Sequence, residues 1–244
     1  MNFYGITDRG KIRKKNQDDF RAETSGGGEV MTAVLCDGMG GERAGEIASA
    51  LACDSFMFHA AASLDKKSGQ SDMENILREA AEYANKVVYE KALDDLSCLG
   101  MGSTLVALAV NGKKAAVANV GDSRCYLYSG KKLTKVTKDH SYVESLVEKN
   151  LITPQEAKVH PKRNYLMRAI GTEPSVKVDI FGLKLKSGDK LLLCSDGLSN
   201  SIPEEVIKNV FSSGKTPDKI AEELLRLSLA AGARDNVTIF VAEC

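Results

Sequence analysis

Five aspartates with a common placement could do chemistry together in this chain, namely Asp18, Asp37, Asp122, Asp196 and Asp235. Each stands within a residue or two of the end of an expected β-strand. Antiparallel strands bring alternate ends to a common edge, so this placement predicts an acidic cluster at one rim of the sheets. Carboxylates within about 4–6 Å of one another repel unless a cation offsets their charge. Oxygen ligands without His or Cys favour Mg²⁺ or Mn²⁺, or Ca²⁺ in a roomier site, over zinc or copper.

Asp37 is the centre of this hypothesis. It follows the apolar run 30–36 and precedes Gly38-Met39-Gly40-Gly41, which would leave one carboxylate beside bare backbone. An Asp-Gly pair after a strand is more often a tight turn than a metal ligand, so Asp37 alone decides nothing. Five aspartates placed alike favour a site for two adjacent divalent ions, which would acidify a bound water and direct it at an electrophile.

Arg13 indicates what that electrophile would be. It lies in the charged loop 8–19 that also carries Asp18, and its guanidinium can hold a phosphoryl group through two parallel hydrogen bonds. The neighbouring Lys11, Lys14 and Lys15 would raise the local concentration of anions, although a basic run is more often a solvated loop. The residues therefore predict a metal site directed at phosphate.

The apolar patterning predicts the strands and helices that would position these residues. Strands are expected at 2–7, 20–22, 30–36, 103–110, 115–120, 125–128, 133–136, 176–185, 189–194 and 237–242. Helices are expected at 42–62, 71–93, 141–149, 154–160, 201–211 and 217–231, the second with Ser71 and Glu74 as a capping box. A tight turn at 25–28 would make its flanking strands antiparallel and place Asp18 and Asp37 at the same end. The short helices within about 138–172 indicate a small inserted lobe.

Composition narrows the class of protein. The 244 residues carry 33 Lys and Arg against 33 Asp and Glu, so no net charge favours nucleic acid or an anionic membrane as a partner. No apolar run approaches the roughly 20 residues of a spanning helix, and the chain opens without a secretion signal. Six cysteines without C-x-x-C spacing favour buried free thiols, and the three histidines are too far apart for a local metal motif. We expect a single domain over residues 1–244, cytoplasmic and monomeric.

The motifs around these residues resemble, in order, those of one family, the metal-dependent protein phosphatases of type 2C. The resemblance covers essentially the whole chain and rests on Thr7-Asp8-Arg9-Gly10, Arg13, Asn16-Gln17-Asp18, Asp37-Gly38-Met39-Gly40-Gly41, Gly102-Ser103-Thr104, Gly121-Asp122-Ser123-Arg124, Ser195-Asp196-Gly197 and Arg234-Asp235-Asn236. The stretch from His140-Ser141 through residues 167–171 is similar to the flap of the bacterial members, which oppose Hanks-type serine/threonine kinases. The resemblance implies an α+β fold, a four-layer α-β-β-α sandwich with two central antiparallel sheets, a pair of helices on each outer face and a small helical flap.

The resemblance also implies a dinuclear metal centre. Asp37 would bridge two Mn²⁺ or Mg²⁺ ions and act as a catalytic residue. The Gly38 carbonyl would bind the first ion, and Asp196 and Asp235 would bind the second. These roles are those of the matching family positions.

The remaining implied roles surround that pair of ions. Asp18 would hold a metal-bound water, Asp122 would contribute to a weaker third ion, and Arg13 would be the catalytic residue that binds the substrate phosphate. The implied reaction is hydrolysis of phosphoserine and phosphothreonine in proteins by direct attack of a metal-activated water on phosphorus, without a phosphoenzyme. The implied partners are phosphorylated proteins, among them a Hanks-type kinase and its substrates.

Two departures from the family pattern and two alternative functions stay open. Met39 stands where many eukaryotic members have a histidine proposed as the general acid, and Gln17 stands where many members have glutamate. One alternative is a regulatory phosphatase dedicated to a single partner, as in anti-sigma pathways; no sensor or receiver domain supports it here. The other is a catalytically silent phosphoprotein-binding relative, whose usual mark is loss of a metal aspartate, and all of them are present.

Overall fold

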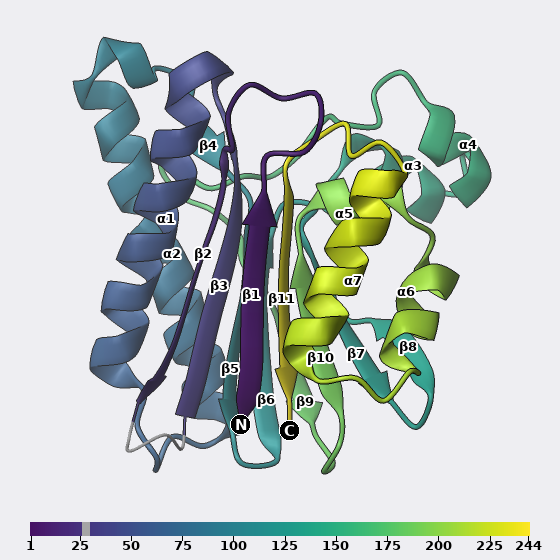
Figure 1. The fold of residues 1–244 in the computed structure, drawn as a ribbon. Helices are drawn as coiled ribbons and strands as arrows, with labels where there is room; N and C mark the ends of the chain where they lie inside the picture. The colour runs from purple at the N-terminus through teal and green to yellow at the C-terminus, as the bar shows by residue number, and fades with distance from the viewer. Residues whose placement is uncertain (26–29) are drawn as a thin grey trace.

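Two antiparallel β-sheets packed face to face form the centre of the molecule, and helices cover the outer face of each (Figure 1). The computed structural model describes residues 1–25 and 30–244. The turn expected at 25–28 falls on residues that, apart from Ser25, lie outside the described part of the chain. The expected strands are present, with boundaries that differ by a few residues.

The first sheet has the spatial order β2-β3-β5-β6-β9, and all its neighbouring strands are antiparallel. Its strands are β2 (Asp18–Ser25), β3 (Val30–Met39), β5 (Leu105–Asn111), β6 (Lys114–Val120) and β9 (Asp179–Lys184), with the short β4 (Gly102–Ser103) paired to the end of β3. Asp18 stands opposite Asp37 in the β2–β3 register. The prediction that these two aspartates lie at the same end of the sheet is therefore confirmed.

The second sheet has the order β1-β11-β10-β7-β8 and is also antiparallel. Its strands are β1 (Asn2–Asp8), β7 (Arg124–Ser129), β8 (Lys132–Lys135), β10 (Lys190–Cys194) and β11 (Val237–Glu243). β1 and β11 lie side by side, so the loop that leaves β1 and the turn that enters β11 meet at one rim (Figure 1). This brings Arg13 close to Asp235, 222 residues further along the chain.

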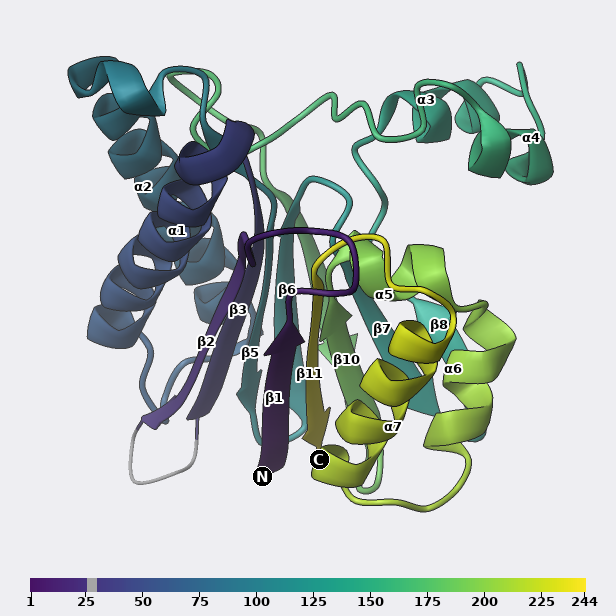
Figure 2. The ribbon, with the colours of Figure 1, turned by 45° about the horizontal axis from the view of Figure 1, so that its top comes forward.

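The helices form the two outer layers. α1 (Gly41–Ser63) and α2 (Gln70–Asp94) cover the first sheet, and the 3₁₀ turn η1 (Leu96–Cys98) follows them. α5 (Asp196–Ser201), α6 (Glu204–Phe211) and α7 (Pro217–Ala230) cover the second sheet. α3 (Tyr142–Glu148) and α4 (Pro154–Val159) belong to the stretch between β8 and β9 and stand apart from both sheets, beyond the rim that carries the Arg13 loop (Figure 2).

Three apolar layers hold these elements together. One lies between the first sheet and α1 and α2, and another lies between the second sheet and α5, α6 and α7. The middle layer joins the two sheets through side chains that include Leu35, Leu108, Leu193 and Phe240, none more than 1% exposed. Strands that are covered on both faces are apolar on both faces, as the continuous runs in the sequence predict. The α+β, four-layer sandwich is therefore confirmed.

One helix differs from the sequence prediction for a local reason. In place of a single helix over 201–211, α5 ends at Ser201 and α6 begins at Glu204. Pro203 lies between them and separates the two helices, because its ring cannot continue an α-helix but readily precedes a first turn. The sequence pattern predicts no helix at 196–200, and there Asp196 is the first residue of α5.

The start of α2 also differs. The helix begins at Gln70, and the Asp72 carboxylate accepts a hydrogen bond of 2.7 Å from the backbone N–H of Gly69. Glu74 instead accepts a hydrogen bond of 2.8 Å from the side chain of Gln70. The predicted capping box between Ser71 and Glu74 is therefore wrong by two residues.

The thiols agree with the expectation from composition. All six cysteines are free, and five of them are buried. Cys36 and Cys53 belong to the apolar layer beneath α1. Among the described residues, no helix is both long and apolar enough to cross a membrane.

The middle layer makes a prediction about stability. Phe240 is 1% exposed between the sheets and stacks on Phe3 with ring centroids 5.7 Å apart. Phe240→Ala should lower the free energy of unfolding by about 3–5 kcal/mol, because it leaves a cavity between two sheets that cannot collapse onto it. Urea denaturation followed by circular dichroism measures this difference.

A matched variant controls for the loss of a phenyl ring as such. Phe58 on α1 is 73% exposed. Phe58→Ala should change the free energy of unfolding by no more than about 0.5 kcal/mol. Equal effects of the two substitutions would contradict the assignment of Phe240 to the core between the sheets.

Candidate active site

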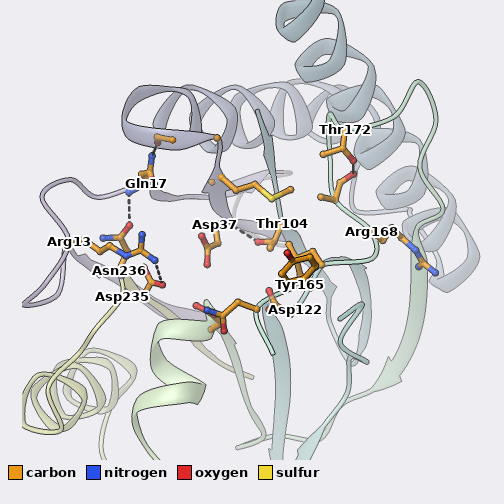
Figure 3. Close-up of a pocket in the computed structure, with 18 of the residues that line it drawn as sticks. Arg13, Gln17, Asp37, Thr104, Asp122, Tyr165, Arg168, Thr172, Asp235 and Asn236 are labelled. Atoms are coloured by element: carbon orange, nitrogen blue, oxygen red, sulfur yellow. Dashed lines mark hydrogen bonds and ion pairs between the residues drawn. The ribbon is translucent and has the colours of Figure 1, made fainter. Parts of the chain in front are cut away.

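The structure brings the five predicted aspartates together at one rim of the sandwich. A cavity of about 1090 Å³ is lined by Asp37, Asp122, Asp196 and Asp235, together with Arg13. Figure 3 shows Asp235 and Arg13 on one side of this cavity, Asp37 in the middle and Asp122 on the other side. Asp18 lies beneath them and is 7% exposed. The acidic cluster that the strand-end pattern predicts is therefore present.

Burial and mutual repulsion raise the pKa of several of these carboxyl groups. Burial, and then the charge of Asp196, raise the pKa of Asp122 to about 8. Burial, and then the charge of Asp235, raise the pKa of Asp196 to about 6. The pKa of Asp37 is raised well above its usual value by burial and by the charges of Asp18 and Asp196. Negative charge is therefore in excess here, and a bound cation would offset it.

Asp18 and Asp196 each carry an oxygen that is unsatisfied within the described part of the chain. Asp18 Oδ2 accepts hydrogen bonds of 2.7 Å from the hydroxyls of Ser195 and Thr238, whereas its buried Oδ1 has no partner there. Burial raises the pKa of Asp18 to about 7 although these two hydrogen bonds lower it. Asp196 Oδ2 accepts a hydrogen bond of 3.0 Å from Asn200, and its buried Oδ1 is likewise without a partner. Buried carboxylate oxygens in this condition fit a bound cation or an ordered water.

The arrangement of donors limits which ions fit. Within residues 1–25 and 30–244, no three side chains of His, Cys, Asp or Glu form a group that could hold a metal ion by themselves. Mg²⁺ commonly keeps several of its waters and binds through one or two carboxylates rather than in an all-protein cage. The site therefore fits hard divalent ions that retain waters.

Backbone hydrogen bonds and hydroxyls fix Asp37 at the end of β3. Its N–H donates to Thr104 Oγ1 at 2.9 Å, and its carbonyl accepts from the Thr104 N–H at 2.9 Å and from the Ser103 hydroxyl at 3.0 Å. The Thr104 and Ser123 hydroxyls share a hydrogen bond of 2.7 Å. This corner therefore leaves the Asp37 side chain as the free part of the residue, pointing into the cavity (Figure 3).

Gly38 occupies a position that admits only glycine. A Cβ there would lie 1.9 Å from the carbonyl oxygen of Gly45 in α1. The Gly38 N–H donates to the carbonyl of Gln17 at 3.0 Å, which links the end of β3 to the Arg13 loop. Bare backbone beside Asp37 thus results from close packing against α1.

Arg13 is the cation that faces the acidic cluster from the loop between β1 and β2. Its Nη2 donates to Asp235 Oδ2 at 2.8 Å, and its side chain is 52% exposed at the cavity wall. A guanidinium with one face on a carboxylate keeps further N–H donors for an anion. The geometry therefore leaves Arg13 free to bind phosphate that enters the cavity.

The two departures from the family pattern are both at the cavity wall. Met39 lines the cavity, and its thioether carries no proton to donate. Gln17 Nε2 donates to the backbone carbonyl of Gly41 at 2.6 Å. The amide of Gln17 therefore supports the glycine turn at the start of α1 in place of adding a charge.

Sequence reasoning missed the polar residues that hold the aspartates and the loop. Ser195 and Asn236 stand inside motifs that single out their neighbours, and Thr238 alternates like any other strand residue. Their contacts join segments up to 227 residues apart, which local patterns do not reveal. Only their adjacency to Asp196 and Asp235 could have drawn attention to them.

The other wall of the cavity comes from the stretch between β8 and β9. Tyr165 and Met167 line it and are each 63% exposed. Arg168 is held away from the carboxylates by Asp179 at 2.8 Å and stands 3.0 Å from Nε2 of His140. The Nδ1 of His140 accepts a hydrogen bond of 3.0 Å from the backbone N–H of Gly121, the residue before Asp122. This stretch is thus tied to the corner that carries Asp122.

A two-sheet sandwich with a carboxylate-lined cavity flanked by an arginine is typical of metal-dependent phosphatases. Comparison with known proteins agrees: residues 11–225 match the model of the protein phosphatase 2C family. The chain is 35% identical over 237 residues to a serine/threonine phosphatase, stp, of Listeria monocytogenes, covering 97% of this chain and 93% of the relative. The chain therefore belongs to the protein phosphatase 2C family of metal-dependent serine/threonine phosphatases.

Solved structures are similar over the whole chain. The serine/threonine phosphatase Stp1 from Staphylococcus aureus superposes with a TM-score of 0.92 at 36% identity, covering 99% of this chain and 94% of that one. The catalytic domain of the serine/threonine protein phosphatase PstP, in complex with two manganese ions, superposes with a TM-score of 0.85 at 33% identity, covering 99% and 97%. The fold and the use of divalent metal by this family are consistent with the acidic cluster.

Binding of a divalent ion should stabilise the folded protein. At about a hundredfold excess over the dissociation constant, Mn²⁺ should add about 2.7 kcal/mol to the free energy of unfolding, or about 5–10 °C to Tm. Asp196→Asn should raise Tm in the absence of metal, because it removes one repelling charge, and should lose most of the shift that Mn²⁺ causes. Differential scanning calorimetry with Mn²⁺ and with EDTA measures both effects.

A second aspartate controls for the removal of a charge. Asp94 is exposed at the end of α2 and is not among the residues that line the cavity. Asp94→Asn should leave the metal-free Tm and the Mn²⁺ shift as they are in the unsubstituted protein. A Tm of the unsubstituted protein that stays unchanged when Mn²⁺ or Mg²⁺ is added would contradict the metal site.

Proposed function

We propose that this chain hydrolyses phosphoserine and phosphothreonine in proteins at a dinuclear Mg²⁺ or Mn²⁺ centre. The observation that carries the proposal is a group of carboxyl groups with excess negative charge that lines one cavity together with a half-exposed arginine. Such a group is costly unless cations bind to it, and bound cations beside an arginine form a site for phosphate. Family membership supports the same reaction.

The ligand set of the proposed centre is carried over from the matching positions of the family. Asp37, the Gly38 carbonyl, Asp196 and Asp235, together with bound waters, would hold the two ions. Asp122 would serve a weaker third ion near Asp196. When bound, the ions would supply an acidified water as the nucleophile and would neutralise charge on the phosphoryl oxygens.

Residues of the chain would bind the phosphoryl group and orient a water. Arg13 holds the phosphoryl group with N–H donors that Asp235 leaves free, and Asp235 fixes the direction of its guanidinium. Asp18 presents Oδ1 as an acceptor for a water, because Ser195 and Thr238 already occupy Oδ2. Met39 has no proton to give the leaving group, so a metal-bound water or another group would have to supply it.

The surroundings of the site complete the proposal. Residues 1–244 form a single catalytic domain, and residues of about 138–172 form a flap beside the cavity. The separation of α3 and α4 from both sheets supports this interpretation (Figure 2). The protein would act as a cytoplasmic monomer on phosphorylated proteins and oppose a Hanks-type kinase. The presence of all five aspartates in one cluster disfavours a silent phosphoprotein-binding relative.

Activity with defined substrates tests the proposed reaction. An aryl phosphate and a phosphothreonine peptide should both be hydrolysed with Mn²⁺ and not with EDTA, since the nucleophile and the charge balance both need the ions. Asp37→Asn and Asp196→Ala should each reduce kcat/KM by about a hundredfold or more, while Asp94→Asn should not change it. Release of inorganic phosphate measures the rates. Activity that survives chelation and both active-site substitutions would sink the metal mechanism.

Arg13 should act mainly on substrate binding. Arg13→Ala should raise KM for phosphate substrates by about tenfold or more, because it removes charge-assisted hydrogen bonds to the phosphoryl group. The factor by which kcat falls should be smaller than the factor by which KM rises. Steady-state kinetics on the phosphothreonine peptide measures both constants, and an unchanged KM would contradict the assigned role.

A further inference from the structure

The loop that carries Arg13 has no regular structure of its own. Residues 9–17 between β1 and β2 form turns and bends without a strand ladder. Such a segment keeps one conformation only where its backbone groups bind partners elsewhere in the protein. The place of the Arg13 guanidinium therefore depends on contacts from outside the loop.

Asn236 supplies three of those contacts through one buried side chain. Its Nδ2 donates to the backbone carbonyls of Arg9 and Lys15, both at 2.9 Å, and its Oδ1 accepts from the N–H of Gln17 at 2.8 Å. Asn236 is 4% exposed, so water does not compete for these groups. Figure 3 shows Asn236 beside Arg13, with its bond to Gln17 drawn. A single buried amide thus ties the beginning of the loop to its end.

We propose that Asn236 is a positioning residue that holds the 9–17 loop closed and so aims the Arg13 guanidinium at the phosphate site. This inference deepens the proposed function and rests on it for its kinetic consequences. Asn236 follows Asp235, which accepts from Arg13 at 2.8 Å. Two adjacent residues therefore divide the work: Asp235 orients the guanidinium, and Asn236 orients the backbone beneath it.

Other contacts do not replace Asn236. The Lys11 N–H donates to the carbonyl of Ala233 at 2.9 Å in the first half of the loop. At its end, the side chains of Lys15, Asn16 and Gln17 bind Glu46, Thr7 and Gly41, but these three contacts are exposed to water and none joins the beginning of the loop to its end. Gly38 is fixed independently, since it pairs with Ser103 of β4. Loss of the Asn236 amide should therefore free Arg13 while Gly38 and the carboxylates keep their places.

Asn111 offers a matched control for a lost side-chain amide. Its Nδ2 also donates to two backbone carbonyls, those of Lys66 at 3.1 Å and Ser68 at 3.0 Å. It lies at the end of β5 that is remote from the cavity, opposite Val30 rather than Asp37. Asn111→Ala should therefore loosen a different loop.

Limited proteolysis tests the closure of the loop without any need for activity. The loop contains five trypsin sites, after Arg9, Lys11, Arg13, Lys14 and Lys15. Asn236→Ala and Asn236→Asp should each speed cleavage at these sites by about tenfold, because cleavage follows the population of the opened loop. Asn236→Asp keeps the volume and the acceptor for Gln17 but has no donor for the two carbonyls. Asn111→Ala should speed cleavage after Lys66 instead, as mass spectrometry of the fragments would reveal.

A double-mutant cycle tests whether the closure serves Arg13. With Mn²⁺ and the phosphothreonine peptide, Asn236→Ala should lower kcat/KM by about tenfold, mainly through KM. When Arg13 is already replaced by alanine, Asn236→Ala should lower kcat/KM by less than twofold, because there is no guanidinium left to position. Asn111→Ala should leave kcat/KM unchanged both in the unsubstituted protein and in the Arg13→Ala variant.

The outcomes separate this inference from the proposed function. Cleavage in the loop that stays at the unsubstituted rate in both Asn236 variants overturns the positioning role, whatever the enzyme does. If the double variant loses kcat/KM by the product of the two single losses, the two residues act independently, and the proposed dependence of Arg13 on Asn236 is wrong. An unsubstituted protein without phosphatase activity refutes the proposed function, while the proteolysis still decides whether Asn236 holds the loop.

Discussion

Repulsion among carboxylates held close together is the constraint on which this structure depends. Besides burial, the charges of Asp18, Asp196, Asp122 and Asp235 all raise the pKa of Asp37, and the positive charges of Arg124 and Arg13 lower the pKa of Asp196. A cluster of this kind would spread apart if the backbone could move. The fold prevents this movement because each aspartate is attached to the end of a strand or the first turn of a helix. The three apolar layers therefore supply the stability against which the charges are held.

The polar residues around the cluster decide which oxygen of each carboxylate stays free. Ser195 and Thr238 both bind Oδ2 of Asp18, and their own hydroxyls are tied to the strands that carry them. Thr104 binds the backbone of Asp37 and leaves its side chain alone. Preorganised acceptors of this kind do not have to reorient when a cation arrives, which is a general source of tight binding and of catalysis. The arrangement thus turns an unfavourable charge density into a defined binding site.

Much of the fold and of the site could be predicted from sequence, because the signals are local. Continuous apolar runs predict strands that are covered on both faces, and each reactive aspartate comes directly before or after such a run. The common rim followed from antiparallel pairing alone, as the Asp18–Asp37 register confirms. The contact of Asp18 with Ser195 joins residues 177 apart, and that of Asn236 with Arg9 joins residues 227 apart. Contacts over such distances in the chain have no periodicity to reveal them. The break between α5 and α6 could have been predicted from the sequence if Pro203 had been given more weight than the apolar pattern around it.

The cavity combines a rigid floor with walls of a different kind. The floor consists of strand ends and one helix start, whereas one wall is the irregular 9–17 loop and the other comes from the stretch between β8 and β9. That second wall presents Tyr165 and Met167 largely to solvent, so it contributes little to the apolar core. Substitutions there would leave the three apolar layers and the charge balance of the floor intact. Chemistry and recognition are therefore separable in part: the floor and Arg13 act on the phosphoryl group, whereas the wall between β8 and β9 can vary with the chain that carries this group.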